Sequence, residues 1–371
     1  MKNEGKEPFI RISKRDSMPL WQSVGVRLIA ILISLVICGL IIYAIVKLNP
    51  VKVYATMFEG AFGTNKRTWV TIRDIMMMLC IAVGLAPAFK MRFWNIGAEG
   101  QILVGGVAAA GLMRNLVKGG GMSSNALLLV IMAVAAVLAG GIWGVIPGIF
   151  KAKWNTNETL FTLMMNYIAI QLTSYFVALW ENPYGSSSVG ILNPTTRMGW
   201  LPSIVGEQYL LNVIIVMIVA VAMYLYLKYS KQGYEIGVVG ESENTARYAA
   251  INVKQVIIRS MAISGAICGL AGFLTVSGAG HTISTSTAGG RGFTAIIVAW
   301  LAKFNTFVMI LISALIVFLE KGAMEIASRY ELNDFVSEMI TGIILFFILG
   351  SEFFISYKVK FRGRKQKEDA E

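Results

Sequence analysis

The stretch from Phe93 to Gln101 reads Phe-Trp-Asn-Ile-Gly-Ala-Glu-Gly-Gln and separates two long apolar runs. Asn95 is a residue type preferred at helix N-caps, and Glu99 would then lie in the first turn, where the helix dipole favours negative charge. The two glycines permit the close approach of another backbone or of a solute. At membrane depth, irregular backbone and an ionisable side chain are tolerated where protein packs around them or where they line a wet cavity. The stretch therefore predicts a membrane helix that is broken inside the protein.

The composition of the whole chain is that of a membrane protein. Of its 371 residues, 56% are hydrophobic and 15% are charged, and the mean hydropathy is +0.65. A spanning helix needs about 20 apolar residues, and the sequence offers about ten such runs. We expect an all-α polytopic fold with spans at 24–46, 69–89, 96–113, 126–149, 158–180, 211–228, 257–277, 292–303, 306–320 and 335–356.

The run at 292–303 is too short to cross a membrane alone. We expect it to be half of a broken helix, with the stretch Gly278 to Gly292 as the other half. The pair Gly84-Leu85 followed by the first break resembles Gly269-Leu270 followed by the second, as an inverted repeat would require. Chance similarity between glycine-rich membrane segments is the alternative. For the first break, the alternative is that Glu99 and Gln101 only hydrogen-bond one helix to the next.

Lys and Arg residues predict the orientation of the chain. The loops on the N-terminal side of the membrane carry 20 of them and the opposite loops carry 9, so both termini should be cytoplasmic. We expect a cytoplasmic N-terminal segment at 1–23, a transmembrane domain at 24–356 and a basic cytoplasmic tail at 357–371. The net charge of +12 then follows from membrane orientation, and it does not indicate nucleic acid binding. The longest external segment should run from Glu181 to Tyr209.

Residue types that carry chemistry are sparse. The three cysteines lie in apolar runs without paired spacing, and His281 has no nearby Cys or carboxylate cluster, so no metal site is predicted. The sequence contains no phosphate-binding Gly-x-x-x-x-Gly-Lys-Ser/Thr loop and no nucleophile with a recognisable base. We therefore expect no enzymatic activity and no cofactor in this chain.

A cytoplasmic loop at about 229–256 carries the segment Gly240 to Ile251. Ser242 is placed to cap a short helix, with Glu243 in its first turn. Three alanines, Ala246, Ala249 and Ala250, should form a small-residue face that fits a groove of a partner. A plain solvated connector is the alternative.

These motifs together resemble one family. The first break resembles the Asn-Ile-Gly-x-Glu-Gly-Gln signature of bacterial ABC importer permeases of the nucleoside and simple sugar uptake group, within the branched-chain amino acid and ribose permease family. The stretches Asn157 to Ala169, Gly233 to Ile251 and Gly292 to Ala299 extend the resemblance over most of the chain. Trp300 and Lys303 depart from the family pattern.

The resemblance implies a membrane-spanning permease subunit of the bacterial plasma membrane, which forms the translocation path for a small polar solute, most often a nucleoside. The implied partners are an ATP-binding subunit, a second permease subunit, an extracellular substrate-binding lipoprotein and the lipid bilayer. The implied path residues are Asn95, Glu99, Gln101, Asn166, Tyr167, Phe293 and Thr294. The implied coupling residues, which dock on the ATPase, are Gly240, Glu241, Ser242, Asn244, Ala246, Arg247, Tyr248, Ala249 and Ala250.

Two other cargoes and one other class stay open at this stage. A sugar or a branched-chain amino acid would also suit the polar residues of the path. A secondary transporter driven by protons or sodium is the remaining class, and Asp74, Glu99 and Lys303 would be its relay.

Overall fold

The computed structural model describes residues 10–14, 20–47, 49–118 and 124–332, separate positions between 339 and 355, and residues 357–361. The chain divides into two compact units. One unit comprises residues 64–317, and the other comprises residues 1–63 together with 318–371.

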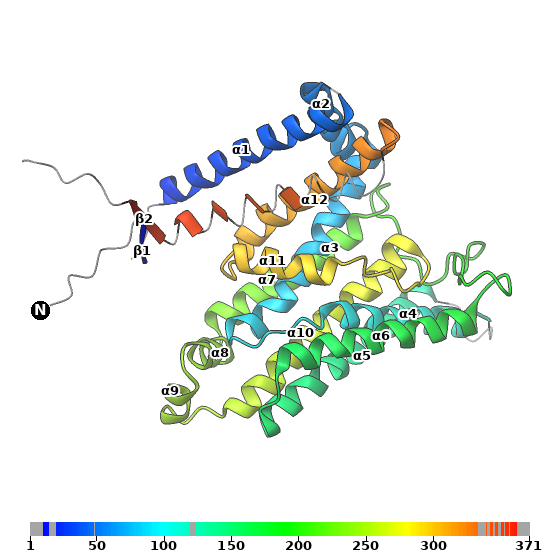
Figure 1. Cartoon of the computed structure of the whole chain (residues 1–371). Helices are drawn as coiled ribbons and strands as arrows, with labels where there is room; N and C mark the ends of the chain where they lie inside the picture. The colour runs from blue at the N-terminus through cyan, green and yellow to red at the C-terminus, as the bar shows by residue number, and fades with distance from the viewer. Residues whose placement is uncertain are drawn as a thin grey trace, which may run out of the picture. The chain divides into compact units, whose positions relative to one another are not determined.

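The unit at 64–317 is helical (Figure 1). Its helices are α3 (Asn65–Lys90), α4 (Ala98–Lys118), α5 (Asn125–Trp154), α6 (Glu158–Trp180), α7 (Leu210–Tyr229), α8 (Lys231–Glu241), α9 (Glu243–Tyr248), α10 (Val253–Thr275), the π-helix η1 (Val276–Gly280), α11 (Arg291–Leu301) and the first part of α12 (Thr306–Arg329). Helix α10 lies in the middle of this unit and packs against α5, α4 and α3.

Glycines set the spacing of the central helices. A Cβ atom on Gly105 of α4 would lie 2.5 Å from the Cα of Gly269 on α10, and a Cβ on Gly269 would overlap the Ala136 carbonyl oxygen of α5. In lipid, helices associate through close van der Waals packing, for which small residues are required at the crossing point. The three helices therefore form a tightly packed core.

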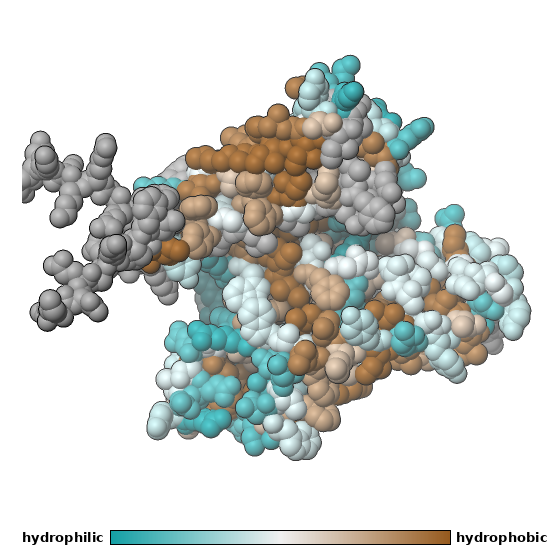
Figure 2. Space-filling view, in the orientation of Figure 1, coloured by the Kyte–Doolittle hydropathy of each residue, from teal (hydrophilic) through white to brown (hydrophobic). Residues whose placement is uncertain are grey.

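Long helices of this unit present apolar side chains outward. Helix α5 exposes Leu127, Ile131, Val134, Leu138 and Ile142, which recur every three to four residues along one stripe. Hydrophilic residues instead gather around α8 and α9 (Figure 2). A lipid-facing side and a polar end are thus distinct on the surface of the unit.

Seven helices in the described part of the chain are long and apolar enough to span a membrane: α3, α4, α5, α6, α7, α10 continued by η1, and α12. They correspond to seven of the ten predicted spans. The predicted span at 24–46 coincides with α1 (Leu20–Val46). The span at 335–356 lies largely outside the described residues.

The second unit contains α1, α2 (Pro50–Phe62), the end of α12 and two strands, β1 (Ile10–Lys14) and β2 (Tyr357–Phe361). Asn49 caps α2 by accepting a hydrogen bond from the Val51 amide at 2.9 Å, and Pro50 fits its first position. The strands pair antiparallel, with Ile10 opposite Phe361. The sequence did not predict this ribbon, which joins the N-terminal segment to the C-terminal tail.

The predicted half-helix from Gly278 to Gly292 is wrong. Helix α10 runs unbroken to Thr275 and ends in η1, and a loop then leads to α11. His281 (φ 50°), Gly289 (φ 60°) and Gly290 (φ 74°) all adopt left-handed conformations, which cannot continue a right-handed helix. The short helix predicted at 292–303 is present as α11.

Candidate functional site

The break between α3 and α4 is a hydrogen-bonded turn inside the protein. Asn95 is fully buried, and its Oδ1 accepts a hydrogen bond from the Gly97 amide at 3.0 Å. Its Nδ2 donates to Ser264 Oγ of α10 at 3.1 Å. The sequence predicted Asn95 as the N-cap of a helix from Ile96, and this prediction is wrong, because α4 begins only at Ala98. Asn95 instead closes a local turn.

Side chains of α6 satisfy the backbone of this turn. Asn166 accepts a hydrogen bond from the Gly100 amide and donates one to the Ile96 carbonyl, both at 2.8 Å. Thr162 Oγ accepts from the Ile96 amide at 3.2 Å. Irregular backbone in a membrane needs such partners, so the amide of Asn166 holds the turn in place. Tyr167 points away from it and is 65% exposed.

Glu99 joins the turn to the start of α11. Its Oε1 accepts a hydrogen bond from the Gly290 amide at 2.7 Å, and its Oε2 accepts one from the Gly292 amide at 2.9 Å. A Cβ atom at Gly292 would lie 2.6 Å from the Glu99 nitrogen, so only glycine allows this approach. The carboxylate thus caps α11 from another helix, where the helix dipole favours a negative charge.

A buried ion pair fixes the same end of α11. Asp74 of α3 is buried, and its Oδ1 lies 2.8 Å from Arg73 Nη2 and 3.4 Å from Arg291 Nη2. The Arg73 guanidinium in turn lies over the Tyr209 ring, 4.7 Å from its centroid. Two carboxylates from two helices therefore hold the N-terminus of α11.

Three residues of α11, Phe293, Thr294 and Trp300, are not buried. Phe293 is 43% exposed, and Thr294 Oγ donates to the Gly290 carbonyl at 3.3 Å. Trp300 stacks on Trp94 of the break, with ring centroids 5.1 Å apart and planes 21° apart. The sequence marked Trp300 only as a departure from the family pattern, and its spacing from Trp94 gave no signal of this contact.

The segment expected to couple to an ATPase forms α8 and α9. Ser242 caps α9 as predicted, because its Oγ accepts a hydrogen bond from the Thr245 amide at 3.2 Å, and Glu243 lies in the first turn. Gly240 packs against the turn after α3, where a Cβ atom would overlap the Lys90 carbonyl oxygen. The predicted alanine face is wrong in part: Ala246 is 0% exposed within this chain, whereas Ala249 and Ala250 are exposed.

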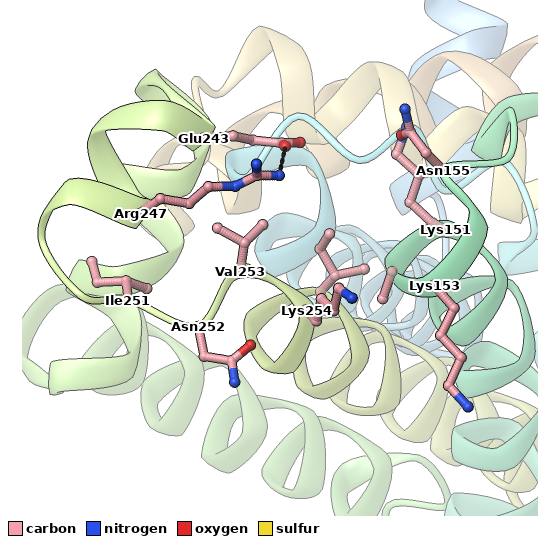
Figure 3. A pocket seen from close by; sticks show the side chains of 11 residues that line it. Lys151, Lys153, Asn155, Glu243, Arg247, Ile251, Asn252, Val253 and Lys254 are labelled. Carbon is pink, nitrogen blue, oxygen red and sulfur yellow. Dashed lines mark ion pairs between the residues drawn. The ribbon is translucent and has the colours of Figure 1, made fainter.

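A hollow of about 550 Å³ lies between the end of α5, α9 and the start of α10 (Figure 3). Arg247 points toward Glu243, with 3.7 Å between Nη2 and Oε2. Lys151, Lys153 and Lys254 also line this hollow, so its charge is predominantly positive. Lys151 is paired with Glu158 at 2.9 Å.

The chain matches a known protein family over most of its length. Residues 69–349 match the family model described as "Branched-chain amino acid transport system / permease component". The chain therefore belongs to this family of ABC importer permeases. It is a multi-pass membrane protein and the permease subunit of an ABC transporter, and it is not itself an enzyme. An ABC permease works with ATPase and binding-protein partners.

Three relatives match over most of their length. The "Guanosine ABC transporter permease protein NupP" of Bacillus subtilis (strain 168) is 31% identical, over 93% of this chain and 97% of the relative. The "Glucose ABC transporter permease protein TsgB13" of Haloferax volcanii is 27% identical, over 97% and 96%. The "Nucleoside ABC transporter permease protein NupB" of Lactococcus lactis subsp. cremoris is 27% identical, over 88% and 91%. No solved structure matches the chain.

Proposed function

We propose that this permease carries nucleosides into the cell. The observation that carries the proposal is the similarity to the guanosine permease, at 31% identity over nearly the whole chain, together with that to a second nucleoside permease. The second candidate cargo is a simple sugar such as glucose, which the similarity to the Haloferax volcanii permease favours.

The path runs beside the turn and the first residues of α11. The amides of Asn95, Gln101 and Asn166 are engaged in hydrogen bonds within the protein, so they shape the path instead of contacting the solute. Phe293 and Thr294 lie on the first turn of α11, and the exposed ring of Phe293 is available to a solute. Glu99 sets the position of Phe293 and Thr294, because its carboxylate accepts hydrogen bonds from the Gly290 and Gly292 amides just before them.

Ion-coupled transport is disfavoured by the contacts of the buried carboxylates. Glu99 accepts two backbone hydrogen bonds, and Asp74 lies beside two arginines. Both carboxylates thus hold the start of α11 in place, whereas a proton relay needs a group that readily gains and loses its proton.

Both termini are cytoplasmic in this proposal. The pairing of β1 with β2 supports it, because it keeps the two terminal segments on one side of the membrane. An even number of membrane crossings, which is ten by the sequence, would also place both terminal segments on one side of the membrane. The two breaks, before α4 and before α11, meet at Glu99, as an inverted repeat around a central path would require.

The ATPase docks on α9 and the residues that follow it. Asn244, Tyr248, Ala249 and Ala250 are exposed there, and the positive hollow beside Arg247 complements an acidic partner surface. A second permease subunit completes the membrane part, and a substrate-binding lipoprotein delivers the solute to the outer face, at the segment 181–209. This assembly belongs in the bacterial plasma membrane.

Competition for uptake tests the cargo. The complex, reconstituted with its ATPase and binding protein, should import labelled guanosine, and excess unlabelled uridine should reduce that import more than glucose or leucine does. Import of glucose without import of any nucleoside would rule the proposal out in favour of the sugar.

A further inference from the structure

Buried polar side chains without partners lie near the π-helix η1. Asn212, in the first turn of α7, is 1% exposed, and in the described part of the chain neither its Oδ1 nor its Nδ2 has a hydrogen-bond partner. The hydroxyl of Ser277, within η1, is also buried and unpaired among the described residues. Leaving such groups unpaired in a membrane protein costs free energy, which a hydrogen-bonding molecule bound beside them would recover.

Asn212 lies directly against the π turn. A Cβ atom on Gly278 would overlap both amide atoms of Asn212, so the glycine makes room for that amide. π-Helical turns are rare and are frequent at functional sites. The wide turn and the unpaired amide are independent observations that point to the same place.

An aromatic stack adjoins this place. The rings of Trp200 and His281 lie parallel, with centroids 3.7 Å apart and planes 6° apart. Among the described residues, neither ring nitrogen of His281 has a hydrogen-bond partner. Burial lowers the pKa of His281, so the imidazole is neutral near pH 7 and offers one donor and one acceptor.

The segment 181–209 is fastened over these groups. The Leu201 amide donates to the Ser277 carbonyl at 2.9 Å, and the Leu192 amide donates to the His281 carbonyl at 2.8 Å. Trp200 Nε1 donates to the Leu192 carbonyl at 2.9 Å. Trp200 and Leu201 also line a hollow of about 560 Å³, together with other residues of this segment and Asn125. Trp200 thus contacts both this hollow and the ring of His281.

We propose that Asn212, Ser277 and His281 form a recognition site for a planar, hydrogen-bonding solute of the nucleobase class, which takes the place of the Trp200 ring against His281. An amide presents a donor and an acceptor side by side, as the edge of a base does, and bases stack on aromatic rings. The inference rests on the proposed nucleoside cargo and adds the place where the base is recognised. The segment 181–209 is the lid that Trp200 holds closed.

The decisive variant is Asn212→Leu, assayed in the complex reconstituted with its ATPase and binding protein. Leu has the same branching and the same number of side-chain heavy atoms as Asn, but it has no polar atoms. The initial rate of guanosine uptake should fall about tenfold, as expected for the loss of one buried hydrogen bond. The melting temperature of the variant should rise, because an unpaired buried amide has been removed. If the Asn212 amide had only a structural role, its removal should instead lower the melting temperature.

Two serines provide a matched comparison. Ser260 and Ser277 are both fully buried with unpaired hydroxyls in the described part of the chain, but Ser260 lies in the first half of α10, whereas Ser277 lies in η1 beside Gly278. Ser277→Ala should lower guanosine uptake severalfold, whereas Ser260→Ala should leave it unchanged. If the Asn212→Leu complex fails to assemble, the comparison of Ser277→Ala with Ser260→Ala tests the proposed site instead.

The outcomes separate the site from the cargo. Failure of the unaltered complex to import any nucleoside would remove the cargo proposal and this site with it. Normal guanosine uptake by Asn212→Leu, or equal rates for the two serine variants, would overturn the site while the nucleoside cargo stands.

Discussion

At the scale of single residues, the carboxylate of Glu99 has the most demanding position. It accepts hydrogen bonds from two amides that lie about 190 residues further along the chain, and α4 and α11 therefore share one charged cap. A hydrogen bond to a charged group contributes about 1.5–3 kcal/mol, so this single side chain fixes the geometry of the junction.

Glu99→Gln tests that role. The side-chain amide keeps the size but loses the charge, and its NH2 group would face a backbone N–H donor. Uptake should fall at least about tenfold, which corresponds to the loss of one charge-assisted hydrogen bond, while membrane insertion and assembly persist. Labelled-guanosine uptake by the reconstituted complex measures it.

Glu59 offers the control. Its carboxylate accepts a hydrogen bond from Arg329 Nη1, but in an exposed position far from the proposed path in the sequence. Glu59→Gln should retain nearly full uptake. Equal rates for Glu99→Gln and the unaltered protein would reduce Glu99 to a dispensable contact between helices.

At the scale of elements, the sequence predicts where helices begin and break, because composition and periodicity carry that signal. It does not predict contacts between residues that are far apart in the chain. Polar residues within an apolar run reveal the break at 93–101, and Ser242 followed by Glu243 reveals the start of α9. The partner of Glu99, the stack of Trp94 on Trp300 and the π-helix have no local signature. Helix α9 has only six residues, too few to show from sequence that Ala246 faces inward.

The coupling segment yields a prediction at this scale. Ala249→Trp adds bulk at an exposed position, so the permease should still fold and insert, but it should lose its ATPase or its substrate-stimulated ATP hydrolysis. Lys231→Trp, exposed at the start of α8, is the control and should keep that stimulation. Full stimulation in the Ala249→Trp complex would remove this segment from the coupling mechanism.

The packing of the central helices yields a second prediction at this scale. Gly269→Ala places a methyl group onto the backbone of α5, and overpacking of this kind costs about 1–3 kcal/mol. The purified protein should therefore melt several degrees lower. Gly141→Ala, whose Cβ would make only ordinary contacts at 3.5 Å, should melt as the unaltered protein does. A similar loss in both variants would mean that close approach at Gly269 is not what holds α10 to α5.

At the scale of the whole molecule, the chain is a membrane path without an energy source of its own. Its family membership places ATP hydrolysis on a partner, and its buried carboxylates Glu99 and Asp74 hold the N-terminus of α11. The proposed cytoplasmic termini rest on the positive-inside bias of the loops and on the β1–β2 ribbon.

Uptake of labelled guanosine into proteoliposomes, with and without ATP, tests the central claim most directly. We predict accumulation only when this chain is present with its ATPase, its permease partner and its binding protein, and only with ATP on the side of α8 and α9. Accumulation by this chain alone, driven by a proton or sodium gradient without ATP, would contradict it.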